Sequence, residues 1–102
     1  MIVIGQATLI AAGRKNAPLR KWLAEWTATV GLKSWSSLSD VRVDYPSADG
    51  VSLSGGTIVT VFNVKGNTYR LLTLVYYDVQ TVEVLEIVTH AEYDKEMWKS
   101  RY

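Results

Sequence analysis

One stretch decides the fold: Val61-Phe-Asn-Val-Lys-Gly-Asn-Thr-Tyr-Arg-Leu71. β-Branched and aromatic residues lie on both sides of Lys65-Gly66-Asn67, and glycine and asparagine accept the backbone angles that a tight turn requires. The stretch therefore predicts two strands joined by a turn. A second turn is predicted at Tyr77–Gln80, so the pattern indicates two successive hairpins with strands at Thr57–Phe62, Thr68–Tyr77 and Thr81–Thr89.

The clearest helix comes before these strands and begins at Pro18. Proline fits the first turn of a helix, where its missing N–H costs nothing. Apolar residues then recur at the spacing of one helix face, and Gly31 is a natural stop. That face consists of Leu19, Trp22, Leu23, Trp26 and Val30. We expect it to be buried, most simply against the sheet.

Shorter elements surround this helix. Ile2–Ile4 is typical of a short strand, and residues 5–15 allow a short helix. A helical turn is predicted over residues 38–43 and ends at Tyr45-Pro46, because the residue before proline avoids the α region. Residues 48–56 contain three glycines and two serines and are predicted to form a loop.

Helices that precede a run of strands are typical of the α+β class. The sequence predicts N-terminal helices on one face of a small antiparallel sheet, with Ile2–Ile4 at a mixed edge. At 102 residues the chain corresponds to a single domain, residues 1–102. The tryptophans are assigned mainly to core packing: Trp22, Trp26, Trp35 and Trp98.

Composition excludes several kinds of protein and of site. Hydrophobic residues make up 48% of the chain and charged residues 21%, which is typical of a globular protein rather than a disordered one. The absence of cysteine excludes disulfides, zinc–thiolate sites and thiol nucleophiles. Apolar runs are too short to span a bilayer and no secretory signal opens the chain, so a cytoplasmic protein is expected. The net charge of +1 is weak evidence for a nucleic-acid partner.

Two successive hairpins would bring Lys65, Arg70 and the only histidine, His90, into one neighbourhood. Such a cluster could bind and cleave a phosphodiester, because arginine holds phosphate oxygens through two N–H groups and histidine exchanges protons near neutral pH. Tyr93 would share a face with His90 if a helix starts there, and could donate a proton or stack on a base. The same residues also fit an ordinary polar sheet edge with a structural histidine.

Three further polar residues are candidates for RNA contact: Asn63, Asn67 and Lys95. Asn67 is equally explained by turn formation. Lys95 is equally explained by solvation of a C-terminal helix.

Three motifs together resemble a known family. They are Tyr45-Pro-Ser-Ala-Asp49, the stretch Val61–Leu71, and Thr89-His-Ala-Glu-Tyr-Asp-Lys95. In this order and spacing they are similar to the HigB-type toxins, the RelE-like toxic components of bacterial type II toxin–antitoxin modules. The resemblance covers about residues 18–95, whereas residues 5–17 depart from it and the tail 96–102 has no firm counterpart.

The resemblance implies a RelE-like fold and an endoribonuclease that cleaves messenger RNA on the ribosome, with no metal or other cofactor. It also implies a cognate helix-turn-helix antitoxin, similar to HigA, in a toxin–antitoxin hetero-oligomer. The expected catalytic residues are His90, Arg70, Lys65 and Tyr93, and the expected RNA contacts are Asn63, Asn67 and Lys95.

Two alternatives stay open. One is a member of the same superfamily that inhibits a topoisomerase by binding, and the presence of Lys65, Arg70 and His90 together argues against it. The other is a toxin-like fold that only binds RNA or a protein. A single histidine without an Asp/Glu cluster offers no obvious site for a divalent ion, in agreement with a metal-free reaction.

Overall fold

The computed structural model describes all of residues 1–102. Five strands, four α-helices and one 3₁₀ helix follow one another along the chain. In order they are β1 (Ile2–Ile4), α1 (Gln6–Gly13), α2 (Ala17–Gly31), α3 (Leu38–Asp44), β2 (Asp49–Ser52), β3 (Ile58–Val64), β4 (Tyr69–Tyr76), β5 (Thr81–Thr89), α4 (His90–Asp94) and η1 (Met97–Arg101).

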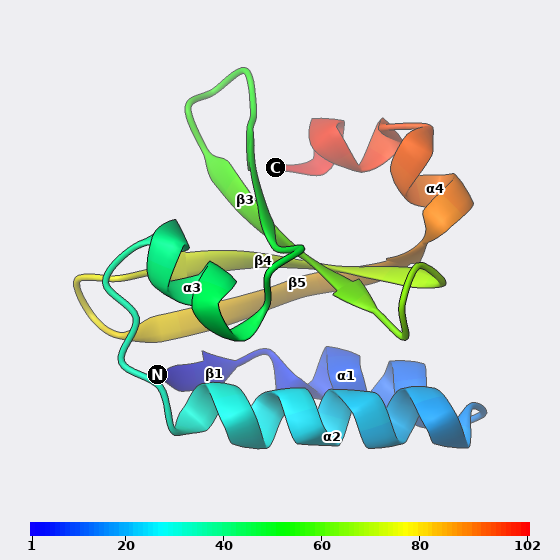
Figure 1. Cartoon of the computed structure of the whole chain (residues 1–102). Helices are drawn as coiled ribbons and strands as arrows, with labels where there is room; N and C mark the ends of the chain where they lie inside the picture. The colour runs from blue at the N-terminus through cyan, green and yellow to red at the C-terminus, as the bar shows by residue number, and fades with distance from the viewer.

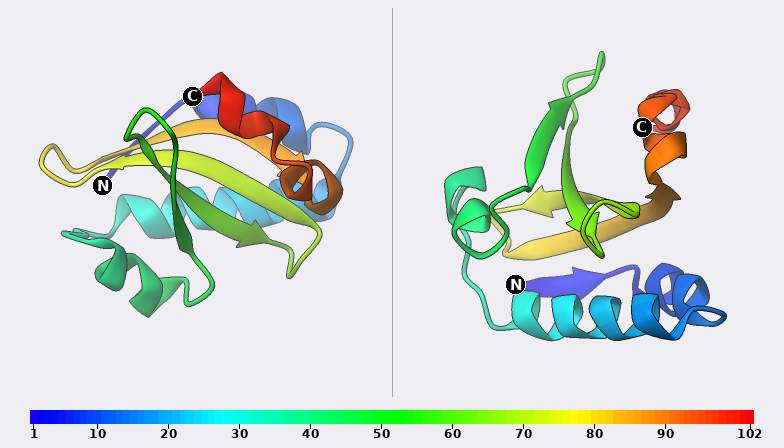
Figure 2. Two further views of the ribbon diagram at one scale, coloured as in Figure 1. Left: turned by 90° about the horizontal axis from the view of Figure 1, so that it is seen from above. Right: turned by 45° about the vertical axis from the view of Figure 1, so that its right-hand side comes forward.

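The strands form one sheet in the order β1-β5-β4-β3-β2. Neighbouring strands are antiparallel, except that β1 runs parallel to β5 at one edge. Helices α1 and α2 lie on one side of β4 and β5, whereas α4 and the C-terminal segment lie on the other (Figure 1). The two further views show the same layers (Figure 2). The predicted α+β class, the N-terminal helices on one sheet face and the mixed edge are confirmed.

The larger core fills the space between α2 and the sheet. Asn16 caps α2, because its Oδ1 accepts the backbone N–H of Leu19 at 3.0 Å. The predicted apolar face of α2 is buried, although Trp22 is only half-buried. The rings of Trp26 and Phe62 meet edge to face with centroids 5.4 Å apart. This packing fixes the middle of the sheet against the helix.

A smaller core lies on the opposite face of the sheet, for which the sequence indicated no cover. Its members come from strands and from the C-terminal segment: Leu53, Val59, Val61, Leu72, Val88 and Trp98. In this region the pairing register of β4 with β5 shifts between Leu72 and Thr73, which marks a β-bulge. Such bulges bend the strands that contain them. Trp98 is only 1% exposed, so its assignment to core packing is confirmed.

The helices are short. The longest, α2, has 15 residues, and no helix combines the length and apolarity needed to cross a bilayer. α1 confirms the short helix that residues 5–15 allow. It follows Gly5, which has a φ of +83° and where a Cβ atom would lie 2.7 Å from the carbonyl oxygen of Val84. Only glycine fits this junction.

The predicted loop at residues 48–56 is wrong in part. Asp49–Ser52 forms β2, an edge strand antiparallel to β3. Aspartate and glycine are poor strand formers. We therefore infer that β2 forms because β3 supplies backbone hydrogen-bonding partners, and not because of its own sequence. The predicted turns after β3 and β4 are confirmed, since β3, β4 and β5 pair sequentially.

Leu71→Ala should strongly destabilise the fold. Leu71 lies at the centre of the larger core with 0% exposure, so truncation leaves a cavity. We expect a loss of about 2–5 kcal/mol in the free energy of unfolding, measured by urea titration. The matched control is Leu32→Ala, at 87% exposure, with an expected change within about 0.5 kcal/mol. Equal losses for both variants would contradict the assigned core.

Asp44 should make the stability depend on pH. The indole N–H of Trp35 donates to Asp44 Oδ2 at 2.9 Å and Lys33 lies 2.9 Å from Oδ1, and both hold the pKa of Asp44 below its usual 3.8. The resulting stability is present above that value and is lost as the pH falls through the lower folded pKa. The stability difference between the parent and Asp44→Asn should therefore be smaller at about pH 2.5 than at about pH 6, by urea titration. A difference independent of pH would contradict this role.

Candidate functional site

Arg70 lies at the centre of the candidate site. Its backbone pairs with Asn63 on β3 and with Val88 on β5, so it occupies the middle strand of the two hairpins. Its Nη2 donates to Asn67 Oδ1 at 2.8 Å, and its Nη1 donates to the carbonyl oxygens of Asn67 and Tyr69 at 3.3 and 3.1 Å. The guanidinium is therefore held in place by the turn before it.

No carboxylate forms an ion pair with Arg70, although the residue is only 8% exposed. The ion pairs of the chain all join other residues. Burial of a cation without a counter-charge is unfavourable. Its Nε makes no hydrogen bond within the chain. An anion such as a phosphate would supply the missing charge through this N–H group.

The ring of Tyr93 contacts the same guanidinium. Arg70 Cζ lies 5.5 Å from the ring centre, within the range of a cation–π interaction. Burial raises the pKa of the Tyr93 hydroxyl above its usual 10, the charge of Asp49 raises it further, and Arg70 opposes these effects only in part. The hydroxyl is therefore protonated at neutral pH and can donate a proton.

His90 is the first residue of α4, directly after β5. Its backbone N–H donates to the carbonyl oxygen of Thr68 at 3.1 Å, which ties α4 to the turn between β3 and β4. Its Nδ1 lies 2.9 Å from Asp94 Oδ2, one helical turn later. In the neutral imidazole, an Nδ1–H group that donates to Asp94 leaves Nε2 as a hydrogen-bond acceptor. The imidazole is 43% exposed, so a substrate can reach it.

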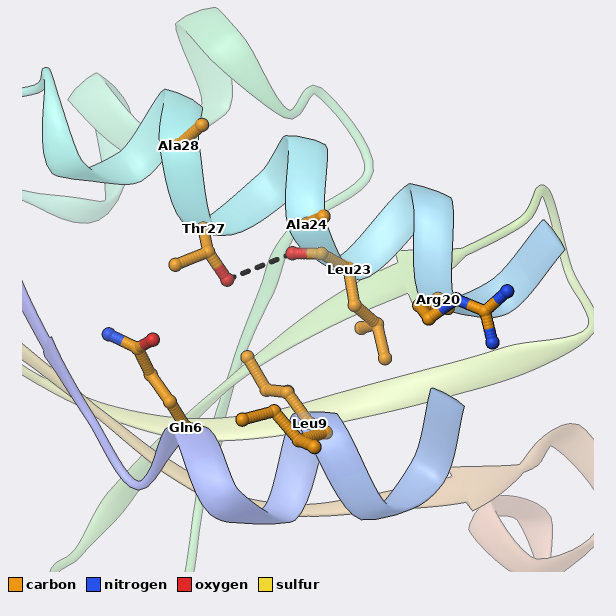
Figure 3. Close-up of a pocket in the computed structure, with 8 residues that line it drawn as sticks. Gln6, Leu9, Arg20, Leu23, Ala24, Thr27 and Ala28 are labelled. Carbon is orange, nitrogen blue, oxygen red and sulfur yellow. Dashed lines mark hydrogen bonds between the residues drawn. The ribbon is translucent and has the colours of Figure 1, made fainter. Parts of the chain in front are cut away.

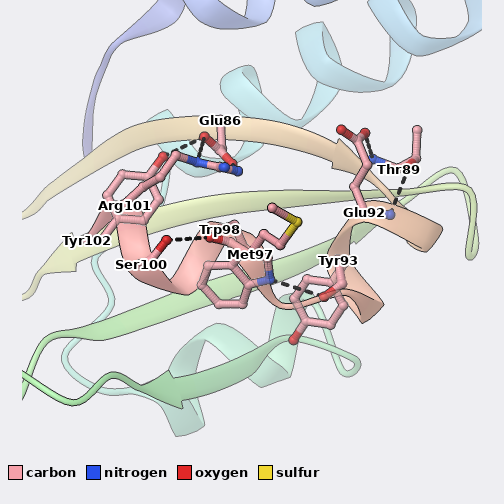
Figure 4. A network of polar contacts seen from close by, with 9 residues as sticks. All are labelled: Glu86, Thr89, Glu92, Tyr93, Met97, Trp98, Ser100, Arg101 and Tyr102. Atoms are coloured by element: carbon pink, nitrogen blue, oxygen red, sulfur yellow. Dashed lines mark hydrogen bonds and ion pairs between the residues drawn. The ribbon is translucent and has the colours of Figure 1, made fainter.

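A capping box holds the first turn of α4, which carries His90 and Tyr93. Thr89 Oγ1 accepts the backbone N–H of Glu92 at 3.1 Å, and Glu92 Oε1 accepts the backbone N–H of Thr89 at 2.9 Å (Figure 4). The hydrogen bond from the Thr89 backbone also lowers the pKa of the Glu92 carboxyl. This turn is therefore fixed by its own side chains.

Lys65 occupies a strained position in the turn between β3 and β4. Its φ is +49° and that of Gly66 is +66°. The left-handed region costs a non-glycine residue about 1 kcal/mol or more. Lys65 forms no ion pair within the chain. A half-buried, strained and unpaired lysine is thus present in the same turn as Asn67.

The predicted site residues fall into two groups. Direct contacts join Arg70 to Asn67 and Tyr93, and Asn63 is its cross-strand neighbour on the same sheet face. These four residues face away from α1 and α2.

The other three predicted residues are Lys65, in the turn after β3, and His90 and Lys95, at the two ends of α4. Thr68 connects two of them, because its N–H donates to the carbonyl oxygen of Lys65 and its carbonyl accepts from His90. Lys95 is the exposed C-cap of α4 and has no ion-pair partner. No hydrogen bond or ion pair joins Lys65, His90 or Lys95 to the Arg70 side chain.

An apolar groove of about 370 Å³ lies on the other side of the sheet, between α1 and α2 (Figure 3). It is lined by Gln6, Leu9, Ile10, Arg20, Leu23, Ala24, Thr27 and Ala28. Arg20 is its one charged group, and its guanidinium donates to the carbonyl oxygen of Gly13 at 3.1 Å. The groove thus lacks an acid–base pair. No group of three or more histidine and carboxylate side chains in the chain could hold a metal ion.

The family described as HigB toxin, the RelE-like toxic component of a toxin–antitoxin system, matches residues 19–96. These residues include the whole site around Arg70. The chain belongs to the HigB toxin family. Three HigB proteins are each 28% identical to it over 94 residues, which cover 92% of this chain and 88% of the relative. They are the mRNA interferase toxin HigB of Escherichia coli (strain K12) and the mRNA interferases HigB of Escherichia coli O157:H7 and Shigella flexneri.

Sequence reasoning missed parts of this HigB-family site. Asp94 was not predicted as a partner of His90, although its position four residues after His90 on a helix was a usable signal. Nothing in the sequence indicates that Asp49 raises the pKa of Tyr93. This effect depends on β2, a strand that the local sequence does not predict.

Proposed function

We propose that this HigB-family chain is a cytoplasmic endoribonuclease, one toxin domain over residues 1–102, that cleaves messenger RNA on the ribosome without a metal. The observation that carries the proposal is the buried guanidinium of Arg70, which has no ion-pair partner within the chain. The ring of Tyr93 lies against this guanidinium, and the pair formed by His90 and Asp94 lies at the end of the adjacent strand. Three relatives bearing the name mRNA interferase support the same reaction class.

The proposed reaction uses these groups in sequence. His90 Nε2 takes the proton of the RNA 2′-OH, and the 2′-oxygen forms a bond to phosphorus. Arg70 and the ammonium group of Lys65 neutralise the negative charge that develops on the phosphoryl oxygens. The bond from phosphorus to the 5′-oxygen breaks, and Tyr93 gives its proton to that oxygen. The products are a 2′,3′-cyclic phosphate and a 5′-hydroxyl.

Three residues are proposed to hold the RNA. Asn67 is exposed, and because its Oδ1 already accepts from Arg70, its amide N–H₂ group is left to donate to RNA. Asn63 shares the sheet face of Arg70. Lys95 is an exposed, unpaired cation at the end of α4, suited to a phosphate of the backbone.

A cognate antitoxin follows from membership of a family of toxin–antitoxin components. We propose that it is a HigA-like protein with a helix-turn-helix domain and that the two form a hetero-oligomer. Co-purification with the product of the neighbouring gene tests this proposal, and a neighbour that neither binds the chain nor restores growth would contradict it.

Induced expression in bacteria, followed by mapping of mRNA 5′ ends, tests the proposed activity. We expect growth to stop and new 5′ ends to appear within translated regions, and we expect neither in cells that express Arg70→Ala. Growth arrest without new 5′ ends would overturn the proposal in favour of a toxin that acts by binding, for example to a topoisomerase. New ends that depend on neither Arg70 nor translation would overturn the assigned site and the ribosome requirement.

A further inference from the structure

The C-terminal segment, residues 97–102, lies outside the family match yet is built into the candidate site. The match ends at residue 96, where Glu96 has a φ of +60° and the chain turns back over the sheet. Trp98 then enters the smaller core and is almost fully buried. The segment is therefore a feature of this chain that the family match does not account for.

Trp98 makes two contacts with Tyr93 (Figure 4). The two rings are stacked, with centroids 5.4 Å apart and planes 14° from parallel. The indole Nε1–H donates to the carbonyl oxygen of Tyr93 at 3.2 Å. Because Tyr93 also contacts the guanidinium of Arg70, the three side chains form a continuous stack from the segment to the buried cation.

Glu86 on β5 fastens the far end of the same segment. Its carboxylate accepts from both Nε and Nη2 of Arg101, and its Oε2 accepts the hydroxyl of Tyr102 at 2.7 Å (Figure 4). Burial and this carboxylate raise the pKa of Tyr102 to about 12, so the hydroxyl remains a donor at neutral pH. Two anchors, Trp98 and Glu86, thus hold six residues across the sheet.

We propose that Trp98 is a positioning residue of the RNA-cleavage site, which holds the Tyr93 ring over Arg70, and that the contacts of Glu86 with Arg101 and Tyr102 keep Trp98 in place. This inference rests on the proposed function. Tyr93 belongs to α4, which has only five residues, none of them buried. Without the stack on Trp98, this short helix alone would have to hold the ring in position. An acid that must reach a departing oxygen loses rate steeply when it moves, by up to about a hundredfold for a 1 Å displacement.

Trp98 variants separate positioning from simple filling of the core. Trp98→Phe keeps an aromatic ring for stacking, whereas Trp98→Leu keeps an apolar side chain without a ring. We expect Trp98→Phe to cleave RNA within about threefold of the parent rate and Trp98→Leu to be about tenfold slower in kcat, with little change in KM. Equal rates for the two folded variants would overturn the role of the stack.

Glu86→Gln tests the anchor without touching either core. Its matched control is Glu83→Gln on the same strand, since Glu83 accepts the hydroxyl of Tyr76 at 2.9 Å and makes no hydrogen bond or ion pair with the C-terminal segment. We expect Glu86→Gln to lower kcat about fivefold and Glu83→Gln to leave it unchanged. In a Tyr93→Ala background, Glu86→Gln should have no further effect, because the side chain through which it acts is gone. An equal loss in both backgrounds, or a faster reaction on loosening the segment, would overturn the proposal.

Proton NMR of the Tyr93 ring makes the test independent of the activity. Stacking on Trp98 should shift these ring signals upfield, and Glu86→Gln should reduce the shift while Glu83→Gln should not. If the parent cleaves no RNA but the shift responds in this way, the proposed function fails and the positioning of Tyr93 stands. If the Tyr93 signals of Glu86→Gln match those of the parent, the positioning proposal is overturned whatever the activity.

Discussion

Arg70→Met should lower the rate of RNA cleavage by a factor of about 10²–10³ while leaving the fold intact. Methionine replaces the stem of the side chain but removes the N–H groups and the charge that would face the phosphate. The native guanidinium is buried without a counter-charge, so its loss should change the free energy of unfolding by less than about 1 kcal/mol or raise it. Single-turnover cleavage of ribosome-bound mRNA and urea titration measure the two effects.

Arg20→Met is the matched control for Arg70→Met. Arg20 lies on α2, on the opposite face of the sheet, and donates to the carbonyl oxygen of Gly13. We expect this variant to cleave at the parent rate. If Arg70→Met also cleaves at the parent rate, the unbalanced cation does not bind the reacting phosphate. If Arg70→Met unfolds the chain, Arg70 is structural.

His90→Gln should slow cleavage by a factor of about 10²–10⁴ without loss of fold, because glutamine cannot take or give a proton at neutral pH. The imidazole is half exposed and its backbone N–H, not its side chain, ties α4 to the β3–β4 turn, so circular dichroism should be unchanged. The double variant that carries both His90→Gln and Arg70→Met should cleave faster than it would if the two single effects simply multiplied. The reason is that both groups act on one transition state. A folded His90→Gln that cleaves at the parent rate would show His90 to be structural.

Lys65→Ala provides a contrast with these two variants. Its ammonium group is one of several cations near the site, so we expect weaker RNA binding, with a raised KM, as well as slower cleavage. The strain of the left-handed backbone at Lys65 would be retained by alanine, so stability is not expected to improve. Binding of a 2′-deoxy substrate analogue, which cannot be cleaved, separates the two effects. Unchanged affinity would remove Lys65 from the RNA-binding surface.

The sequence was most informative where local pattern and tertiary packing agree. The apolar face of α2, the two turns and the sequential hairpins all follow from spacing and turn chemistry, and the structure contains them. β2 could not be predicted, because Asp49 and Gly50 are poor strand residues that pair only once β3 is present. The second core was missed because Trp98 follows a short helix and has no periodic partners nearby in the sequence.

The candidate site shows the same division. The hairpin that carries Asn67 and Arg70 follows from the sequence, whereas the hydrogen bond from Arg70 to Asn67 was not predicted. The motifs indicate His90 as a candidate site residue. Its pairing with Asp94 requires a helix that begins at His90, and the capping box of Thr89 and Glu92 starts that helix. No aspartate or glutamate lies between Asp49 and Asp78 in the sequence, and only the fold shows that none of the more distant carboxylates forms an ion pair with Arg70.

The chemistry of the RNA ends tests the central claim most directly. Purified toxin is mixed with ribosome-bound mRNA, and the ends of the products are identified by mass spectrometry. The roles assigned to His90, Arg70 and Tyr93 predict 2′,3′-cyclic phosphate or 3′-phosphate ends paired with 5′-hydroxyl ends. Products with 5′-phosphate and 3′-hydroxyl ends would contradict the account.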